Sequence, residues 1–331
     1  MILYLLCFLL ACLLSVYLTP LMRQAALSFG IVDKPDGRLK NQAEPVPYLG
    51  GLAVYIAFLV TLAFTFTFDR EVLGLLLGGT LLLLLGLVDD FGVLSPKVKL
   101  MGQFLAAFVM VKAGIKVQIV FLPDLVNIIL SAFWIVAVTN AFNIIDIMDG
   151  LAAGVASVCC LVLSYVAIVN GRPVIAMMTL SLAGAMIGFL RYNFSPAKIY
   201  LGDTGSLFIG CMIASICLIG SYTAHNRIGI LIPVVVLGVP LFDMLFVSYI
   251  RWRRGMSILL GSPDHFALRL RKWRLTTRQT VLCSYGLSAL LGVAGILMLY
   301  ASDLQALMIL AGITLLGLGL GYFLKKIDMT M

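Results

Sequence analysis

Four polar side chains lie at steps of three in the segment NAFNIIDIMDGL: Asn140, Asn143, Asp146 and Asp149. The flanking residues are apolar, and a polar group inside a membrane is costly unless it faces protein, water or a ligand. On a helix this spacing places the four along one drifting stripe, and Gly150 follows where a helix would turn or break. Such a line of oxygens suits a divalent metal or the phosphates around it. Helix-end capping is the alternative, which explains one such residue better than four.

Two further acidic motifs lie at the ends of apolar runs. Asp89 and Asp90 end the run LLLLLGLV, and adjacent carboxylates repel each other unless a cation such as a metal, Lys97 or Lys99 lies beside them. Asp203 lies in GDTGSLFIG, where small residues let backbone amides approach a ligand at the start of a helix. A surface turn and a helix N-cap are the structural alternatives. Together the acidic motifs indicate a Mg²⁺ and diphosphate site, because Mg²⁺ shares its coordination between a few protein oxygens, phosphates and water.

Two basic loops accompany these motifs. The first, VDKPDGRLKNQAEPVPYLGG, carries Arg38, which either contacts a substrate or meets anionic lipid at about 1 kcal/mol per basic residue. The second runs from Arg251 to Arg278 and includes SPDHFALRLRKW. Arginine side chains suit a pyrophosphate, whereas a single histidine is weak support for catalysis. The candidate substrate contacts of the second loop are Asp264, His265, Arg269 and Arg271.

The composition is that of a membrane protein. Hydrophobic residues make up 62% of the 331 residues and charged residues 11%, with a mean hydropathy of +1.10. A soluble globular protein carries about 25% charged residues and is therefore excluded. The net charge of +8 must be placed relative to a membrane, and we expect no nucleic acid partner. The seven cysteines lie in apolar runs without metal-ligand spacing and are expected to be small buried hydrophobic residues.

Apolar runs of about 17 to 25 residues recur along the chain, which predicts an all-α polytopic membrane protein rather than a barrel. Without a linker or repeat, residues 1–331 are expected to form a single transmembrane catalytic domain. About eleven transmembrane helices are expected, at 1–22, 49–68, 71–88, 98–114, 125–142, 150–169, 173–190, 204–222, 228–250, 278–299 and 303–324.

The basic residues predict the orientation of these spans. When the loops between successive spans are assigned in turn to the two sides of the membrane, all but five of the 23 Lys and Arg residues fall on one side. The positive-inside rule makes that side cytoplasmic, so the amino terminus is expected outside and the carboxyl terminus in the cytoplasm. The acidic motifs fall on the same side, which predicts an active site at the cytoplasmic face. The five exceptions are Arg70, Lys112, Lys116, Arg172 and Arg227.

These motifs, from about Asp33 to Asp264, resemble those of the polyprenyl-phosphate N-acetylhexosaminyl-1-phosphate transferases, of the bacterial glycosyltransferase family 4 type. Members of this family move a sugar-1-phosphate from a UDP-sugar to undecaprenyl or dolichyl phosphate with Mg²⁺ and release UMP. The resemblance implies transfer of N-acetylglucosamine-1-phosphate from a UDP-N-acetylhexosamine to undecaprenyl phosphate, at the first membrane step of cell-envelope glycan synthesis. It also implies a multi-pass protein of the bacterial cytoplasmic membrane, surrounded by membrane lipid, with Mg²⁺ or Mn²⁺ as cofactor; homodimerisation stays open.

The resemblance also implies roles for individual residues. Asn143 and Asp203 match the positions of the Mg²⁺ ligands, and Lys99 matches a contact to the phosphates. Asp89 and Asp90 match the acidic pair near the lipid phosphate. We expect Asp89, Asp90 and Lys99 to be the catalytic residues, with Asp90 positioning the lipid phosphate or its proton.

On the nucleotide side, Asp146 and Asp149 match the family's acidic residues, Tyr200 matches an aromatic residue that stacks on uracil, and Asn140 is expected to bind substrate. The second basic loop departs from the family pattern. Family members often carry a cluster of histidines there, whereas this chain has only His265. That difference argues against the branch that uses UDP-MurNAc-pentapeptide, which has three histidines.

Two other functions fit the polar clusters. An intramembrane prenyltransferase would bind a prenyl diphosphate through Mg²⁺ at acidic motifs. An ion-coupled transporter would use intramembrane acids to carry cations, but it would place them near the middle of the bilayer.

Overall fold

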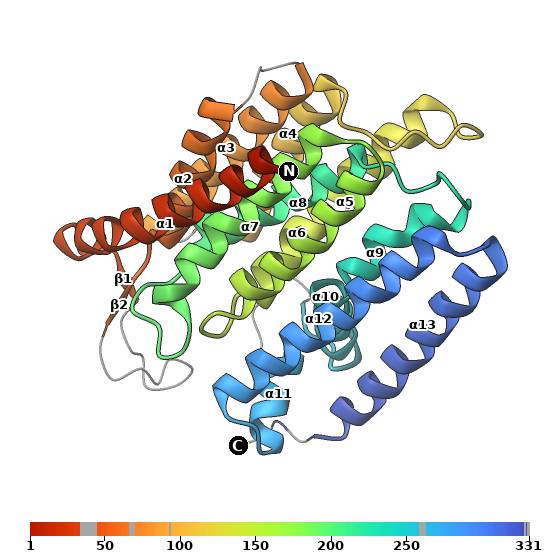
Figure 1. Ribbon diagram of the computed structural model, residues 1–331. Helices are drawn as coiled ribbons and strands as arrows, with labels where there is room; N and C mark the ends of the chain where they lie inside the picture. The colour runs from red at the N-terminus through yellow and green to blue at the C-terminus, as the bar shows by residue number, and fades with distance from the viewer. Residues whose placement is uncertain (34–44, 66–69, 93, 258–262, 328, 330–331) are drawn as a thin grey trace.

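The computed structural model of the chain is a bundle of helices (Figure 1). The part of the chain that it describes comprises residues 1–33, 45–65, 70–92, 94–257, 263–327 and 329. The helices are α1 (Ile2–Ser28), α2 (Gly50–Thr65), α3 (Arg70–Phe91), α4 (Pro96–Ala113), α5 (Asp124–Ile145), α6 (Leu151–Val169), α7 (Pro173–Asn193), α8 (Gly202–Ile219), the 3₁₀-helix η1 (Ile228–Leu231), α9 (Ile232–Val236), α10 (Gly238–Arg253), α11 (Phe266–Trp273), α12 (Thr277–Tyr300) and α13 (Asp303–Lys325).

Each of the eleven predicted spans contains helical structure. Within the described ranges, eight helices are long and apolar enough to cross a membrane, and a bent pair would make a ninth span. The other two predicted spans hold α2, of 16 residues, and α4, of 18 residues. The chain is therefore a polytopic helical membrane protein, as predicted. A short antiparallel ribbon of β1 (Val32–Asp33) and β2 (Val46–Pro47) is an exception to the expectation of helices alone.

The span predicted at 228–250 is broken rather than straight. The segments Ile228–Val236 and Gly238–Arg253 meet at an angle of 76°. Pro240 follows the break and has no backbone N–H to donate to the carbonyl of Val236, so regular helical bonding cannot continue through this point. This bend corrects the prediction of one continuous helix.

α8 lies at the centre of the bundle and packs against α2, α3 and α5, while α7 packs against α1 and α6 (Figure 1). Because lipid tails are as apolar as the helix surfaces, close packing of small residues contributes strongly to helix association in a membrane. α12 and α13 lie on the other side of the bundle, and most of α13 is exposed. The small buried residues of α8 include Gly205, Ser206, Gly210, Ala214 and Ser215.

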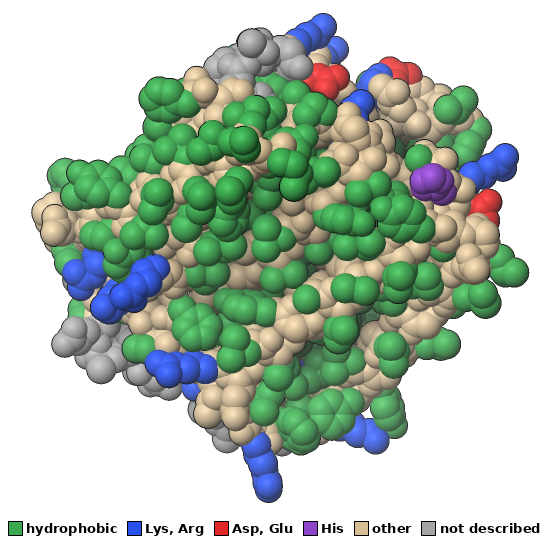
Figure 2. All heavy atoms as spheres, viewed as in Figure 1, with side chains coloured by type: hydrophobic (Ala, Val, Ile, Leu, Met, Phe, Trp, Pro, Cys, Tyr) green, Lys and Arg blue, Asp and Glu red, His purple; other side chains and the backbone are tan. Residues whose placement is uncertain are grey.

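The outer surface is apolar in its middle and polar at its edges. Figure 2 shows hydrophobic side chains over most of the visible face, with Lys and Arg side chains mainly along the rim. On one side of the bundle Lys116 pairs with Asp124. On the other side the Arg23 Nε donates to the carbonyl of Lys198 at 3.0 Å. Near helix ends lie the candidate residues Asp89, Lys99, Asn143 and Asp203.

Candidate active site

The N-terminus of α8 is fixed by two neighbouring segments. Gly202 has a φ of +73°, a left-handed conformation that glycine adopts without a steric penalty. The N–H of Gly50, at the start of α2, donates to the carbonyl of Tyr200 at 3.0 Å. A Cβ on Gly86 of α3 would lie only 2.3 Å from the carbonyl oxygen of Asp203, so this close approach of α3 requires glycine. These contacts determine where the first turn of α8 lies.

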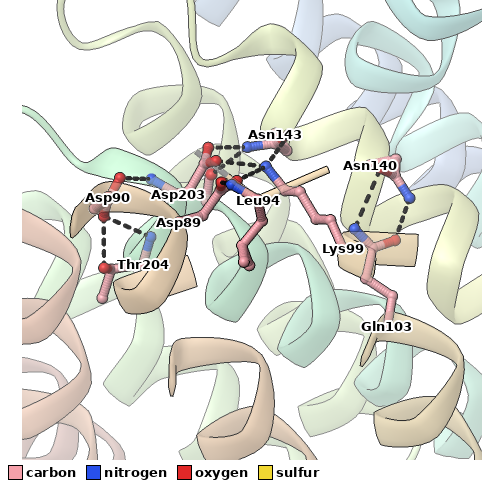
Figure 3. A network of polar contacts seen from close by, with 10 residues as sticks. Asp89, Asp90, Leu94, Lys99, Gln103, Asn140, Asn143, Asp203 and Thr204 are labelled. Carbon is pink, nitrogen blue, oxygen red and sulfur yellow. Dashed lines mark hydrogen bonds and ion pairs between the residues drawn. The ribbon is translucent and has the colours of Figure 1, made fainter. Parts of the chain in front are cut away.

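Asp90 caps this helix from α3 (Figure 3). Its Oδ1 accepts from the N–H of Asp203 at 2.9 Å, and its Oδ2 accepts from the N–H of Thr204 at 3.0 Å and from the Thr204 hydroxyl at 2.6 Å. The N–H groups in the first turn of a helix have no partner within the helix, and a negative charge at this end is favourable. Asp90 therefore holds the backbone of Asp203 in place. Its predicted contact with the lipid phosphate stays a prediction.

Three polar side chains surround the Lys99 ammonium (Figure 3). Its Nζ lies 2.9 Å from Asp89 Oδ2, 2.5 Å from Asp203 Oδ2 and 3.3 Å from Asn143 Oδ1. The other oxygen of Asp89 accepts from the N–H of Leu94 at 2.8 Å. The structure thus brings together side chains from α3, α4, α5 and α8, four of the residues that the sequence predicted for metal binding and catalysis.

The oxygens of Asn143 and Asp203 fit a magnesium ion. The Asn143 Nδ2 donates to Asp203 Oδ1 at 2.6 Å and to the Ser206 hydroxyl at 2.9 Å, which turns its Oδ1 toward the Lys99 ammonium. Asp203 Oδ2 faces the same ammonium. In the part of the chain that the structure describes, no group of three or more His, Cys, Asp or Glu side chains could hold a metal. Mg²⁺ commonly takes only one or two protein carboxylates together with phosphates and water, so this donor set suits it.

The side chain of Asn140 forms a hydrogen bond with a residue of a neighbouring helix. Its Nδ2 donates to Gln103 Oε1 at 2.5 Å and to the carbonyl of Val136 at 2.8 Å. Both N–H groups of the amide therefore have partners within the protein, and the predicted substrate contact of Asn140 stays a prediction.

Asp146 lies beside the acidic group at the N-terminus of α8. Burial raises the pKa of Asp146 well above its ordinary value, and the negative charges of Asp203, Asp90 and Asp149 raise it further. The concentration of acids is consistent with a site for a cation and the groups that it binds.

Asp149 and Tyr200, both predicted for the nucleotide side, lie near each other. Burial raises the pKa of the Tyr200 hydroxyl to about 12, and the charge of Asp149 contributes to the rise. The Tyr200 ring lies 6.1 Å from that of Tyr48. Asp149 Oδ2 accepts from the N–H of Ala197 at 3.0 Å, which joins the segment after α5 to the segment before α8.

Comparison with known proteins identifies the family. A sequence profile of glycosyl transferase family 4 matches residues 72–221, which contain the cluster around Lys99. A probable undecaprenyl-phosphate N-acetylglucosaminyl 1-phosphate transferase of Bacillus subtilis (strain 168) is 33% identical over 312 residues, covering 92% of this chain and 87% of the relative. The chain belongs to glycosyl transferase family 4. It is therefore a transferase, and the family predicted from its motifs is confirmed.

Two further relatives show the breadth of the match. A decaprenyl-phosphate N-acetylglucosaminephosphotransferase of Mycolicibacterium smegmatis is 31% identical, covering 83% of this chain and 77% of the relative. A phospho-N-acetylmuramoyl-pentapeptide-transferase of Caldanaerobacter subterraneus is 30% identical, covering 78% of this chain and 86% of the relative. Membership of glycosyl transferase family 4 by itself does not identify the sugar.

The candidate residues of the second basic loop lie outside the segment matched by the glycosyl transferase family 4 profile and form a separate cluster. Asp264 is fully buried and pairs with Arg254 at 2.9 Å and with Arg269 at 2.6 Å. Arg269 also donates to the carbonyls of Leu324, in the last turn of α13, and of Ile327, just after that helix. The His265 Nδ1 lies 2.8 Å from Asp243 Oδ2. These partners fix α11 against α10 and α13, so substrate contacts for Asp264, His265 and Arg269 stay predictions.

The remaining two candidates are Arg271 and Arg38. Arg271 is exposed on α11. Arg38 lies outside the described residues. Their predicted contacts with substrate phosphates are untested.

Gln103 was not among the predicted site residues, and no partner was predicted for Asp243. Gln103 follows Lys99 by four residues in an apolar helix. Because a polar side chain inside a membrane is costly, this amide was the signal in the sequence for a functional position. Asp243 accepts from the N–H of Phe266 at 2.8 Å and binds His265, which accounts for an acid inside the predicted ninth span.

Proposed function

We propose that the enzyme transfers N-acetylglucosamine 1-phosphate from its UDP-sugar to undecaprenyl phosphate, releases UMP, and so begins a cell-envelope glycan. The observation that carries this proposal is the convergence of Asp89, Asn143 and Asp203 on the Lys99 ammonium, inside the segment that matches glycosyl transferase family 4. The names of the Bacillus and Mycolicibacterium relatives, which combine a polyprenyl phosphate with N-acetylglucosamine, support the choice of substrates.

In the proposed reaction, an oxygen of the lipid phosphate attacks the phosphorus next to the sugar. The bond from this phosphorus to the bridging oxygen breaks, and UMP leaves with the bonding electrons. A phosphate monoester has a second pKa of about 6 and is mostly dianionic at pH 7, so the attack needs little help from a base. Direct displacement without a covalent enzyme intermediate is the simplest course.

The chain's residues would bind and orient the reactants. Lys99 would stabilise negative charge on the diphosphate, and Asp89 and Asn143 would hold its ammonium in position. Mg²⁺ or Mn²⁺ bound by Asn143 and Asp203 would supply further positive charge to the phosphates. The uridine would lie near Tyr200 and Asp149, where a neutral phenol can stack on the base.

The proposed arrangement in the membrane has eleven spans in a single transmembrane catalytic domain. The amino terminus would lie outside, and the carboxyl terminus and the active site would lie at the cytoplasmic face of the bacterial inner membrane. The distribution of Lys and Arg supports this orientation, since all but five of the 23 lie on one side of the predicted spans. The enzyme would act within membrane lipid as a monomer or homodimer.

Cysteine labelling tests the orientation. Lys198 and Thr223 are both exposed and lie before and after α8. In a background without native cysteines, a membrane-impermeant maleimide should label Thr223→Cys in intact cells and Lys198→Cys only after permeabilisation. Labelling in the reverse order would show that the proposed orientation is wrong.

An assay with purified enzyme tests the reaction. A panel of labelled UDP-sugars is incubated with undecaprenyl phosphate and Mg²⁺, and both UMP and the labelled lipid are measured. UDP-N-acetylglucosamine should yield equal amounts of UMP and glycolipid. A prenyltransferase would instead consume a prenyl diphosphate, and a transporter would release no UMP, so either result would overturn the proposal.

A further inference from the structure

Gln103 and Asn140 form a reciprocal amide pair between α4 and α5 (Figure 3). The Asn140 Nδ2 donates to Gln103 Oε1 at 2.5 Å, and the Gln103 Nε2 donates to Asn140 Oδ1 at 3.4 Å. Gln103 is 1% exposed. A buried amide that loses its partner leaves donors and acceptors unsatisfied, at a cost of about 1–3 kcal/mol. The pair is therefore a specific contact between two apolar helices.

The bonding of Asn140 leaves it little capacity to bind a substrate. A primary amide has two N–H donors. One of them bonds Gln103 and the other bonds the carbonyl of Val136, while the amide oxygen accepts from Gln103. Both the amide nitrogen and the amide oxygen of Asn140 therefore form hydrogen bonds within the protein.

The pair lies about one helical turn from the active site on both helices. Gln103 follows Lys99 by four residues on α4, and Asn140 precedes Asn143 by three residues on α5. With a rise of 1.5 Å per residue, these steps correspond to about 6 Å and about 4.5 Å along the helices. A shift of α4 along α5 would therefore move Lys99 relative to Asn143, whose Oδ1 lies 3.3 Å from the Lys99 Nζ.

We propose that Gln103 and Asn140 are positioning residues that fix the register of α4 on α5, so that Lys99 meets Asn143 and Asp203. This inference rests on the proposed transfer reaction and adds a role for two residues that need not touch a substrate. It also assigns Asn140 to helix positioning instead of substrate binding.

A double-mutant cycle tests the pair. Gln103→Leu and Asn140→Leu should each lower kcat by about tenfold to a hundredfold, because a displacement of about 1 Å at a reacting group has effects of this size. The KM values for the UDP-sugar and for the lipid phosphate should stay within about twofold of those of the wild type, since no substrate contact is lost. The double variant should be no slower than the slower single variant, because either change removes the same interaction.

Asn127→Leu is the matched control. Asn127 is a buried amide on the same helix, but it bonds the backbone of Ile119 at the opposite end of α5. This variant should lower the thermal unfolding temperature in detergent while keeping kcat near the wild-type value. Multiplicative losses in the double variant, or a raised KM in Asn140→Leu alone, would overturn the positioning role.

The same variants separate this inference from the proposed function. If the wild-type enzyme produces no UMP from any UDP-sugar, the proposed function is wrong. The unfolding temperatures of the same single and double variants are then compared. We expect the decrease in the double variant to be smaller than the sum of the two single decreases. Additive decreases would show that Gln103 and Asn140 do not interact.

Discussion

Replacing Asp203 with alanine is expected to lower the transfer rate at least about a hundredfold, which corresponds to about 2.7 kcal/mol of transition-state stabilisation. The Asp203 carboxylate accepts from Asn143 on one oxygen and pairs with Lys99 on the other. Its loss removes a proposed metal ligand and releases both partners from their orientation. The measurement is the initial rate of UMP release over a range of Mg²⁺ concentrations. Asp203→Asn, which keeps one acceptor and loses the charge, should fall between the wild type and alanine.

Asp124→Ala serves as the control for Asp203→Ala. Asp124 also pairs with a lysine, Lys116, but on the opposite side of the bundle, and its side chain is 68% exposed. Exposed ion pairs contribute about 0–1 kcal/mol to stability, so this variant should keep near-normal turnover. Wild-type turnover in Asp203→Ala at ordinary Mg²⁺ would refute the proposed role of Asp203.

The sequence predicted the helical class and the approximate place of each span because the apolar runs are long and continuous. It did not predict where α5 ends. Asn140 and Asn143 lie within α5, whereas Asp146 follows its last residue and begins a turn. The N–H of Gly150 in this turn donates to Asn193 Oδ1, from a different helix, at 3.0 Å. The expected polar stripe therefore ends with α5, and Asp146 and Asp149 lie in the turn that follows.

The hydrogen-bond partners of the site residues could not be predicted from the sequence either. Asp90 and Thr204 are 114 residues apart, and Gln103 and Asn140 are 37 residues apart. Residue types and spacing indicate that such groups need partners inside a membrane, but they do not say which helices approach each other. The chemistry of Asn143, Asp203 and Lys99 was predictable as a class, whereas the capping by Asp90 depends on the packing of α3 against α8.

The second large effect is expected at Asp90. Asp90→Ala removes the three hydrogen bonds that hold Asp203 and Thr204 at the start of α8. The rate of UMP release should fall about a hundredfold, since Asp203 would no longer be held opposite Lys99. The unfolding temperature in detergent should fall too, because each unpaired buried N–H costs about 1–3 kcal/mol. Thr204→Val removes only the hydroxyl bond and should cause a smaller loss of about tenfold.

The pH profile and the kinetics without lipid distinguish positioning from a chemical role of Asp90. Substitution of a positioning residue lowers the rate at every pH but does not change the pH at which the rate falls on the acidic side. That acidic limb should follow the second pKa of the lipid phosphate, at about 6. Asp90→Asn should therefore be slow with an unchanged limb. Direct displacement also requires both substrates before UMP leaves, so the wild type with UDP-sugar and Mg²⁺ alone should give no stoichiometric burst of UMP. A burst of UMP that disappears in Asp90→Asn would show that Asp90 attacks phosphorus. Loss of the acidic limb of the pH profile in that variant would show that Asp90 accepts a proton. Capping of α8 by Asp90 produces neither result.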